Sequence, residues 1–260
     1  DYTLKPLAIY RNFINVFDKY SDYPLNKEED IKKINKKTLG YEDLAALVYI
    51  NLRFYGYKGN DKYIHVVLDE AQDFGLFHYF VIKNLFKNAT FSIFGDLAQS
   101  IYSYQSIDNW EEVKSIIYNN DINILPLDKS YRTTCEIMAA ANKVSGMYGF
   151  GMAQSFLRHG PEVSFIKYNE INLLEKIKSL KDCGYSNIAV ICKSKKSIEK
   201  YVEDINVSGV SVITSYLSKG LEFDCCIVID MDFDRNNMLD MKLLYVAMTR
   251  ALHELIIVTK

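Results

Sequence analysis

Two adjacent acidic residues follow an apolar run near residue 70. Residues 68–73 read LDEAQD, directly after the run that begins at Ile64. Parallel α/β sheets bind ligands at the carboxyl ends of their strands, and neighbouring residues that leave a strand point in opposite directions. Asp69 is therefore placed to hold Mg²⁺, and Glu70 to orient and deprotonate an attacking water. The alternative interpretation is a pair of exposed acids that cap the next helix.

A second polar segment follows the next apolar run. Residues 94–104 read FGDLAQSIYSY. Gly95 suits a tight exit from a strand, and the Gln99 amide is able to reach a phosphate oxygen or a positioned water. Tyr102 and Tyr104 alternate with polar residues, which favours two rings that stack on nucleic-acid bases. Ordinary packing explains either ring equally well, because the chain has 20 tyrosines.

Two arginines lie at predicted helix boundaries. Thr133 and Glu136 have the spacing of a capping box, which predicts that a helix begins there and fixes Arg132 immediately before its first turn. Arg250 lies near the end of the apolar helical segment 243–251. A positioned guanidinium is what phosphoryl transfer needs, whereas an arginine before a helix is more often only solvated.

Short apolar runs alternate with amphipathic stretches from residue 64 onward, after about 40 residues of helical pattern. This alternation predicts an α/β fold with parallel sheets covered by helices. The clearest amphipathic helix is expected over residues 41–55, with one apolar face formed by Leu44, Leu47, Val48, Leu52 and Tyr55. Further helices are expected at 77–86, 136–144, 173–180 and 198–205. The strands are expected at 64–68, 91–94, 122–125, 163–168, 188–192, 210–214, 226–229 and 255–258.

Composition restricts the class of protein. The 260 residues carry a net charge of -2, so no overall basic field indicates nucleic-acid binding, although a local basic groove is compatible with this charge. No apolar run approaches the roughly 18 residues that span a bilayer, and the first residues do not resemble a signal peptide. The five cysteines and four histidines lack metal-ligand spacing. They predict reduced, packed thiols in a cytoplasmic protein without structural zinc.

Five segments resemble, in order, the motifs of superfamily 1 helicases of the UvrD/Rep type. LDEAQD is similar to motif II, GDLAQSIYSY to motif III, LDKSYRTT to motif IV, TSYLSKGLEFD to motif V and LLYVAMTRA to motif VI. The resemblance implies two RecA-like lobes, an incomplete first lobe within residues 1–120 and a second lobe at 121–260. It also implies an ATP-driven motor that binds ATP between the lobes and single-stranded DNA across both.

The resemblance assigns roles at the nucleotide by position. Asp69 would bind Mg²⁺, Glu70 would be the catalytic base, and Gln99 would sense the γ-phosphate of ATP. Arg132 and Arg250 would be two arginine fingers delivered from the second lobe, so that hydrolysis depends on lobe closure.

Further contacts follow from the same resemblance. The residues that would meet the ribose and phosphate side of ATP are Gly220 and Glu222. The residues that would contact single-stranded DNA are Tyr102, Tyr104, Ser215 and Tyr216.

The chain departs from the family pattern in three ways. Motif I is missing, since the sequence contains no Gly-Lys dipeptide. We therefore expect a longer protein whose N-terminal part supplies the phosphate-binding loop, and an isolated chain that hydrolyses little ATP. About 80 residues separate motifs IV and V, too few for a large accessory domain.

The third departure is Tyr216, which stands where many UvrD-type proteins have a histidine. Together with LGYEDLAAL at residues 39–47, it resembles the HelD-like branch, whose members bind and recycle RNA polymerase. A polymerase-binding ATPase is therefore the alternative to a DNA motor. An inactive scaffold is a third interpretation, disfavoured because the set of hydrolytic residues is complete.

Overall fold

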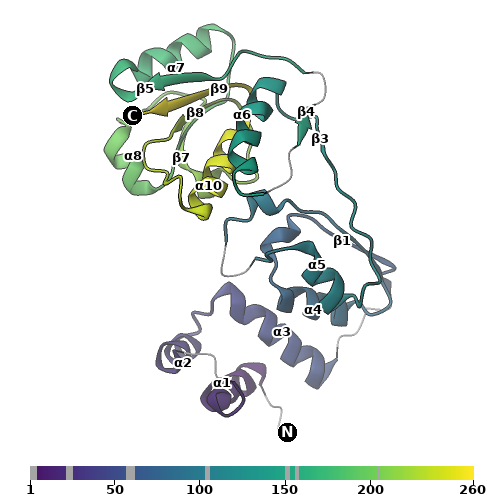
Figure 1. Cartoon of the computed structure of the whole chain (residues 1–260). Coiled ribbons are helices and arrows are strands. Elements are labelled where there is room, and N and C mark those ends of the chain that lie inside the picture. Colours follow the sequence, from purple (N-terminus) through teal and green to yellow (C-terminus); the bar gives the residue numbers. More distant parts are fainter. Residues whose placement is uncertain are drawn as a thin grey trace. The chain divides into compact units, whose positions relative to one another are not determined.

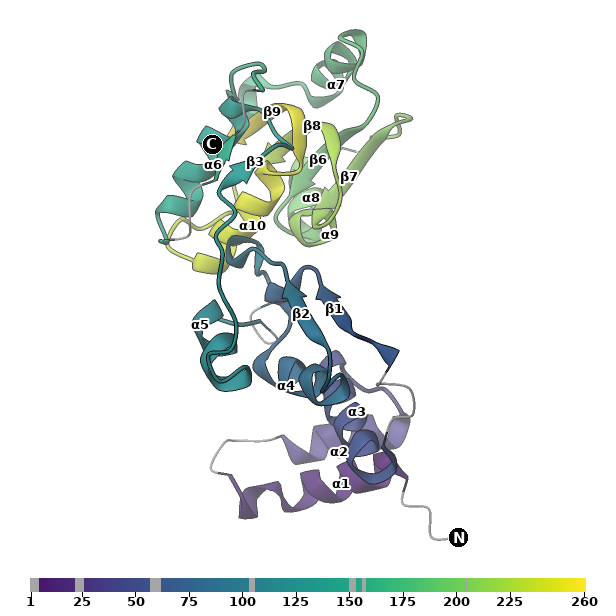
Figure 2. The same ribbon diagram turned by 90° about the vertical axis from the view of Figure 1, so that its right-hand side faces the viewer.

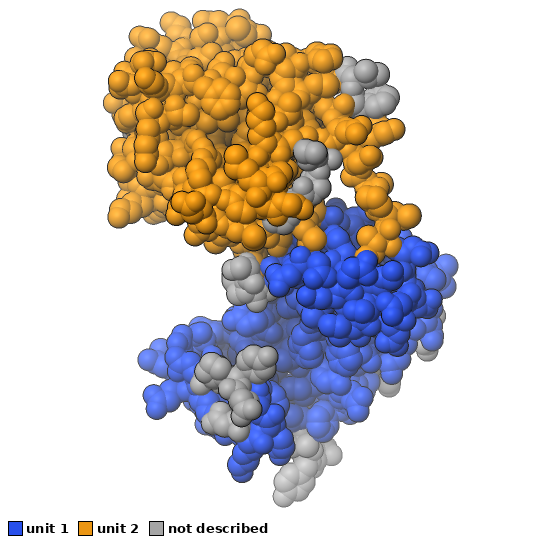
Figure 3. Space-filling view, in the orientation of Figure 1, with its two compact units in different colours: residues 1–95, 104–123 blue, residues 96–103, 124–260 orange. Residues whose placement is uncertain are grey.

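The structure is a computed structural model, shown in two views in Figures 1 and 2. It describes residues 5–21, 26–56, 62–102, 106–149, 153–155, 158–203 and 205–260. The chain divides into two compact units, coloured separately in Figure 3. Unit 1 comprises residues 1–95 and 104–123, and unit 2 comprises residues 96–103 and 124–260. Motif III is therefore divided, with Gly95 in unit 1 and Gln99 in unit 2.

Three helices form the amino-terminal part of unit 1. Their bounds are α1 (Pro6–Val16), which continues into the 3-10 turn η1 (Phe17–Lys19), α2 (Lys27–Lys36) and α3 (Tyr41–Tyr55). Tyr10, Ile14 and Ile34 form a small common core. The Tyr10 hydroxyl donates a hydrogen bond to Asp43 Oδ1 at 2.5 Å, which ties α1 to α3.

Helix α3 has the predicted bounds, but its apolar face is only partly covered. Leu47 packs against the small core, whereas Leu44, Val48 and Tyr55 are 49%, 43% and 46% exposed. The sequence predicts this apolar face, and the described residues cover only part of it. The 3.6-residue period that predicts the helix is local, whereas the segment that covers a helix is set by the rest of the fold.

The other part of unit 1 is a strand–helix–strand segment. Strand β1 (His65–Leu68) pairs in parallel with β2 (Thr90–Ile93), with Leu68 opposite Ile93. The elements between them are the 3-10 turn η3 (Ala71–Asp73) and helix α4 (Leu76–Leu85). Helix α5 (Trp110–Glu112) follows and continues into the π-helical turn η5 (Val113–Ile117). The described residues give this unit a sheet of two strands, which confirms a fragmentary first lobe.

Unit 2 contains a five-stranded parallel sheet of order β5-β9-β8-β6-β7 within the described residues (Figure 1). The strands are β5 (Ser164–Lys167), β6 (Ile188–Cys192), β7 (Val210–Thr214), β8 (Phe223–Ile229) and β9 (Ala251–Thr259). Every residue of β6 is buried, as expected for a central strand of a sheet covered on both faces.

Helices cover both faces of this sheet. One core joins α6 (Cys135–Gly146) and α10 (Met238–Met248) to strand residues such as Ile191 and Val228. The other joins α7 (Leu173–Asp182) and α8 (Lys195–Tyr201) to the alternate strand residues, such as Val190 and Ile227. The prediction of an α/β fold with helix-covered parallel sheets is confirmed.

Two local predictions are wrong. Residues 122–125 form no strand, and Leu125 is 80% exposed, so this apolar run has no sheet neighbour in the described part of the chain. Helix α6 is capped by Thr134, whose Oγ1 accepts a hydrogen bond from the Ile137 amide at 3.4 Å, and not by Thr133. Glu136 does not complete a capping box, because its carboxylate accepts hydrogen bonds from His159 and from the Gly160 amide.

A short parallel pair, β3 (Lys129–Ser130) with β4 (Gln154–Ser155), was not expected from the sequence. The five cysteines are free. The three in β6 and β8 are buried, as expected for packing residues, whereas Cys183 is exposed. Within the described residues, none of the helices has the length and apolar character required to cross a membrane.

Candidate functional site

The acidic pair of motif II lies at the carboxyl end of β1, in unit 1. Asp69 and Glu70 are both exposed. The Glu70 amide donates to Asp69 Oδ1 at 2.8 Å, and Gln72 Nε2 donates to Glu70 Oε2 at 2.6 Å. Glu70 has a φ of 49°, in the left-handed region that non-glycine residues seldom adopt, and such backbone strain concentrates at functional sites. The carboxylate of Glu70 is thus held by a fully buried amide.

Gly95 gives Gln72 the space that it occupies. A Cβ atom at Gly95 would lie 2.6 Å from Gln72 Oε1 and 2.8 Å from two ring atoms of Trp110. The Phe94 carbonyl accepts a hydrogen bond from the Ala71 amide at 2.9 Å, so the ends of β1 and β2 are joined beside this contact. Sequence reasoning missed Gln72. Its position between Glu70 and Asp73 in LDEAQD was the available signal.

In unit 2, motif III contributes a polarised amide. Asp96 caps the 3-10 turn η4 (Leu97–Gln99), accepting from the Ala98 amide at 2.9 Å and from Gln99 Nε2 at 2.8 Å. Gln99 Oε1 accepts from Arg250 NH2 at 3.0 Å. A carboxylate only accepts and a guanidinium only donates, so these two partners fix the orientation of the Gln99 amide. Asp96 is a second residue that sequence reasoning left without a role.

Arg250 is 1% exposed. Besides Gln99, its guanidinium donates to the Val246 carbonyl at 3.0 Å, to Thr249 Oγ1 at 3.1 Å and to the Leu221 carbonyl at 3.4 Å. In this arrangement the predicted arginine finger is a buried link between the motif III turn, the end of α10 and the motif V loop.

Arg132 and Glu222, both predicted at the nucleotide, are brought together in unit 2. Arg132 Nε lies 2.8 Å from Glu222 Oε1, and the two side chains are 48% and 44% exposed. Gly220, two residues before Glu222, is exposed and has a φ of 77°. This left-handed conformation favours glycine. An exposed ion pair of this kind contributes only about 0–1 kcal/mol, so another charged group can replace either partner at little cost.

The predicted DNA contacts differ in their surroundings. The rings of Tyr102 and Tyr216 lie 6.1 Å apart, and Lys219 Nζ lies 5.6 Å from the Tyr102 ring and donates to the Gln99 carbonyl at 2.8 Å. Ser215 opens the short helix α9 (Ser215–Ser218), is fully buried and contacts the Cys192 carbonyl. A buried hydroxyl does not reach a nucleic acid, so Ser215 is corrected to a structural role.

Tyr104 lies outside the described residues. Its predicted stacking on a base therefore stays a prediction.

The candidate metal ligand of this site is the carboxylate of Asp69. Among the described residues no group of three or more His, Cys, Asp or Glu side chains has the geometry of a metal site. Mg²⁺ at a nucleotide usually takes one or two carboxylates together with phosphates and water. The exposed carboxylate of Asp69 at a strand end fits that requirement.

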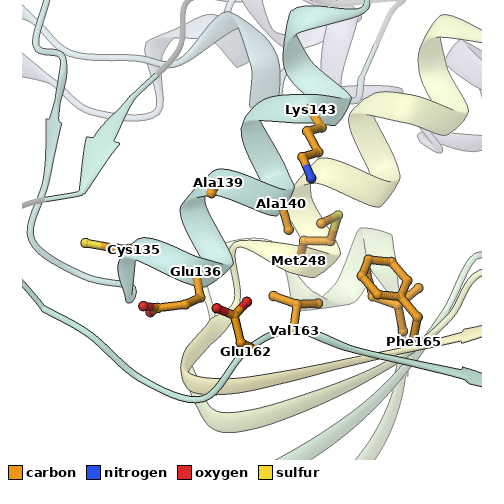
Figure 4. A pocket seen from close by; sticks show the side chains of 10 residues that line it. Cys135, Glu136, Ala139, Ala140, Lys143, Glu162, Val163, Phe165 and Met248 are labelled. Atoms are coloured by element: carbon orange, nitrogen blue, oxygen red, sulfur yellow. The ribbon is translucent and has the colours of Figure 1, made fainter.

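A groove of about 450 Å³ lies elsewhere in unit 2, between α6, the start of β5 and the end of α10 (Figure 4). Glu136 and Glu162 lie close together at one end, Met248 lies in the middle, and Lys143 and Phe165 lie farther from the two glutamates. The described residues predicted to meet nucleotide or nucleic acid do not line it.

The solved structures that are similar to this chain include the following three. The C-terminal domain of a possible DNA helicase from Lactobacillus plantarum is 23% identical, with a TM-score of 0.38, over 50% of this chain and 87% of that one. The PRRSV helicase is 17% identical, with a TM-score of 0.45, over 74% of this chain and 34% of that one. An arterivirus nonstructural protein 10 helicase is 14% identical, with a TM-score of 0.41, over 74% and 38%. The chain thus spans little more than a third of these viral helicases.

Comparison with family models gives two matches, while no curated protein matches the chain. The model of the UvrD/REP helicase N-terminal domain matches residues 11–114, and that of the UvrD-like helicase C-terminal domain matches residues 209–258. These ranges include motifs II and III in the first case and motifs V and VI in the second. Residues 11–114 and 209–258 of the chain are therefore similar, in this order, to the N-terminal and the C-terminal domain of UvrD/REP-type helicases.

Proposed function

We propose that the chain is the motif II to motif VI part of a cytoplasmic, ATP-dependent superfamily 1 helicase or translocase. The full-length protein would couple ATP hydrolysis to movement along single-stranded DNA. Its phosphate-binding loop would come from a part of the protein outside these 260 residues, because they contain no Gly-Lys dipeptide.

The observation that carries this proposal is the Asp96–Gln99–Arg250 hydrogen-bond chain. It joins the Gln99 amide, which is suited to sensing a phosphate, to the buried Arg250, 151 positions away in the sequence. A phosphate that approached Gln99 would compete for its amide hydrogens. The hydrogen bond from Arg250 to Gln99 Oε1 would then change as well. Such a link is expected of a motor, in which the state of the nucleotide must alter contacts elsewhere.

The chemistry assigned to unit 1 uses Asp69 and Glu70. Glu70 would orient a water molecule and accept its proton, and the hydrogen bond from Gln72 would hold the carboxylate in place for that purpose. Asp69 would hold Mg²⁺, which when bound neutralises charge on the phosphates.

In this scheme Arg132 would exchange Glu222 for the nucleotide. Its guanidinium is half-exposed and pairs with Glu222, so a triphosphate is able to replace the carboxylate. An arginine supplied to the transferred phosphoryl group raises kcat by about 10³–10⁵. Glu222 would then be free to accept hydrogen bonds from ribose hydroxyls.

Nucleic-acid binding is assigned to Tyr102, Tyr104 and Tyr216. The support is the pairing of the Tyr102 and Tyr216 rings beside the cationic Lys219. Aromatic faces next to a positive charge are the usual composition of a single-strand binding surface.

The test is the ATPase activity of the full-length protein with and without single-stranded DNA. We expect strong stimulation by single-stranded DNA, a loss of orders of magnitude in Arg132→Ala and Arg250→Ala, and little hydrolysis by the isolated 260-residue chain. Turnover that is insensitive to single-stranded DNA and to both substitutions would refute the proposal.

A second candidate is a HelD-like ATPase that binds and recycles RNA polymerase. It is favoured by Tyr216, whose ring packs against Tyr102 at the place where many UvrD-type proteins have a histidine. In the same assay, stimulation or tight association with RNA polymerase alone, without a response to DNA, would select this function.

A further inference from the structure

Arg158 joins the turn that carries Arg132 to strand β9. Arg158 NH1 donates to the Arg132 carbonyl at 2.8 Å, and NH2 contacts His253 Nδ1 at 2.6 Å. The Arg158 carbonyl accepts from the Cys135 amide at 2.8 Å. One residue thus fixes the backbone on both sides of the start of α6 and connects it to a strand that begins directly after Arg250.

The residues next to Arg158 pack tightly in the same place. The Gly160 amide donates to Glu136 Oε2 at 2.9 Å. A Cβ atom at Gly160 would lie 2.6 Å from Thr134 Cγ2 and 3.0 Å from the His253 carbonyl oxygen. Residues 158–160, here called the strut, therefore fill the space between the turn at 132–136 and β9.

The partner of Arg132 is attached to the same strand. The Phe223 amide donates to the Arg250 carbonyl at 3.0 Å, and Phe223 pairs with Ala251 in the sheet. Glu222 precedes Phe223, so both halves of the Arg132–Glu222 ion pair are fixed to the first residues of β9. One half is held through the strut, and the other through the β8–β9 pairing.

The Arg132 side chain itself has little packing to hold it. It is half-exposed, and an exposed ion pair fixes a long side chain only weakly. Its position therefore depends on where its backbone is held, and Arg158 supplies the side-chain hydrogen bond to that backbone carbonyl.

We propose that Arg158 is a positioning residue that holds Arg132 at a fixed place relative to Arg250, through a bridge from the Arg132 carbonyl to His253. This inference rests on the proposed function for the role of the two arginines, but the bridge itself is testable without activity. Motif comparison does not single out Arg158, because it lies in none of the five motif segments.

The test begins with the arginine side-chain Nε–Hε NMR signals of the 260-residue chain, which has six arginines. In Arg158→Gln we expect the Nε–Hε signal of Arg132 to shift, because Arg132 Nε lies 2.8 Å from Glu222 Oε1 and this distance depends on where the Arg132 backbone is held. The Nε–Hε signal of Arg250, which is bonded to the Val246 carbonyl, should stay in place and remain protected from solvent exchange, and so report that unit 2 is folded.

Arg235→Gln is the matched control. Arg235 is another half-exposed arginine of unit 2 and is paired with Asp230. Its substitution should leave the Arg132 signal unchanged. An unchanged Arg132 signal in Arg158→Gln, or an equal change in Arg235→Gln, would overturn the proposal. If Arg158→Gln does not fold, Arg158→Lys replaces it, since the ammonium still donates to one of the two acceptors and should give an intermediate shift of the Arg132 signal.

Activity of the full-length protein supplies the second readout. A displacement of about 1 Å in a catalytic group costs about 100-fold in rate, so Arg158→Gln should lower kcat by about 10–100-fold with KM little changed. The double variant with Arg132→Ala should be no slower than Arg132→Ala alone. If Arg132→Ala has no effect, the proposed function fails. If it slows hydrolysis and Arg158→Gln does not, only the positioning role fails.

Discussion

Replacement of Gly95 by alanine should perturb both the stability of unit 1 and the predicted catalytic base. The added methyl group would lie 2.6 Å from Gln72 Oε1 and 2.8 Å from Trp110 Cη2 and Cζ2. Carbon contacts are most favourable at about 3.5–4.0 Å, so the methyl group stands roughly 1 Å too close to both neighbours. Gln72 is fully buried and donates a hydrogen bond to Glu70, so a shift of its side chain would disturb that bond.

The expected cost combines two opposing effects. Inserting a methyl group into a packed region costs about 1–3 kcal/mol. Gly95 does not have a positive φ, so alanine also restricts the unfolded chain, which stabilises by about 0.4–1 kcal/mol. The net loss should be about 1–2 kcal/mol. With a urea m-value of about 2 kcal/mol/M, the midpoint of unfolding falls by about 0.5–1 M.

Trp110 makes a fluorescence assay of unfolding specific for unit 1. It is the one tryptophan of the chain and contacts the substituted position, so its fluorescence follows unit 1 during urea unfolding. Gly146→Ala is the control, because a Cβ there meets no atom within 4 Å, and it should leave the Trp110 transition in place. An unchanged midpoint and emission spectrum in Gly95→Ala would show that the close packing around Gln72 is not as described.

Three further outcomes are expected. Glu70→Gln in the full-length protein should retain nucleotide binding and lose hydrolysis, measured by ATP affinity and turnover, because an amide does not accept the proton of water. Tyr104→Ala should weaken binding of single-stranded DNA by about 1–3 kcal/mol in a fluorescence anisotropy titration, and unchanged affinity would return this tyrosine to a packing role. The hydrogen bonds from His159 and from the Gly160 amide lower the pKa of Glu136 from 4.5 to about 2. The stabilisation from this carboxylate is therefore complete above pH 4.5 and is lost as the pH falls toward 2, so acid unfolding of unit 2 should be less steep in Glu136→Gln, followed by circular dichroism.

The local sequence pattern was sufficient to predict many of the helices and strands. Helix α3 and strands β6 and β7 have the bounds expected from the sequence, since their apolar spacing and flanking residues are read within a few positions. The cap of α6 was misplaced by one residue, because two adjacent threonines have equal capping chemistry and only the fold selects between them. The apolar run at 122–125 was taken for a strand because a run of this length does not reveal whether a neighbouring strand exists.

The sequence by itself determined which chemical groups are present and their order along the chain. It indicated the acids after β1, the amide of motif III, the two arginines and the family to which these motifs correspond. Tertiary structure alone decided which of them meet. Arg132 pairs with Glu222 across 90 positions, Gln99 pairs with Arg250 across 151, and Ser215 is buried. Arg158, Gln72 and Asp96 remained unassigned for the same reason, since a hydrogen bond depends on distance and direction in space, which residue type and spacing do not specify.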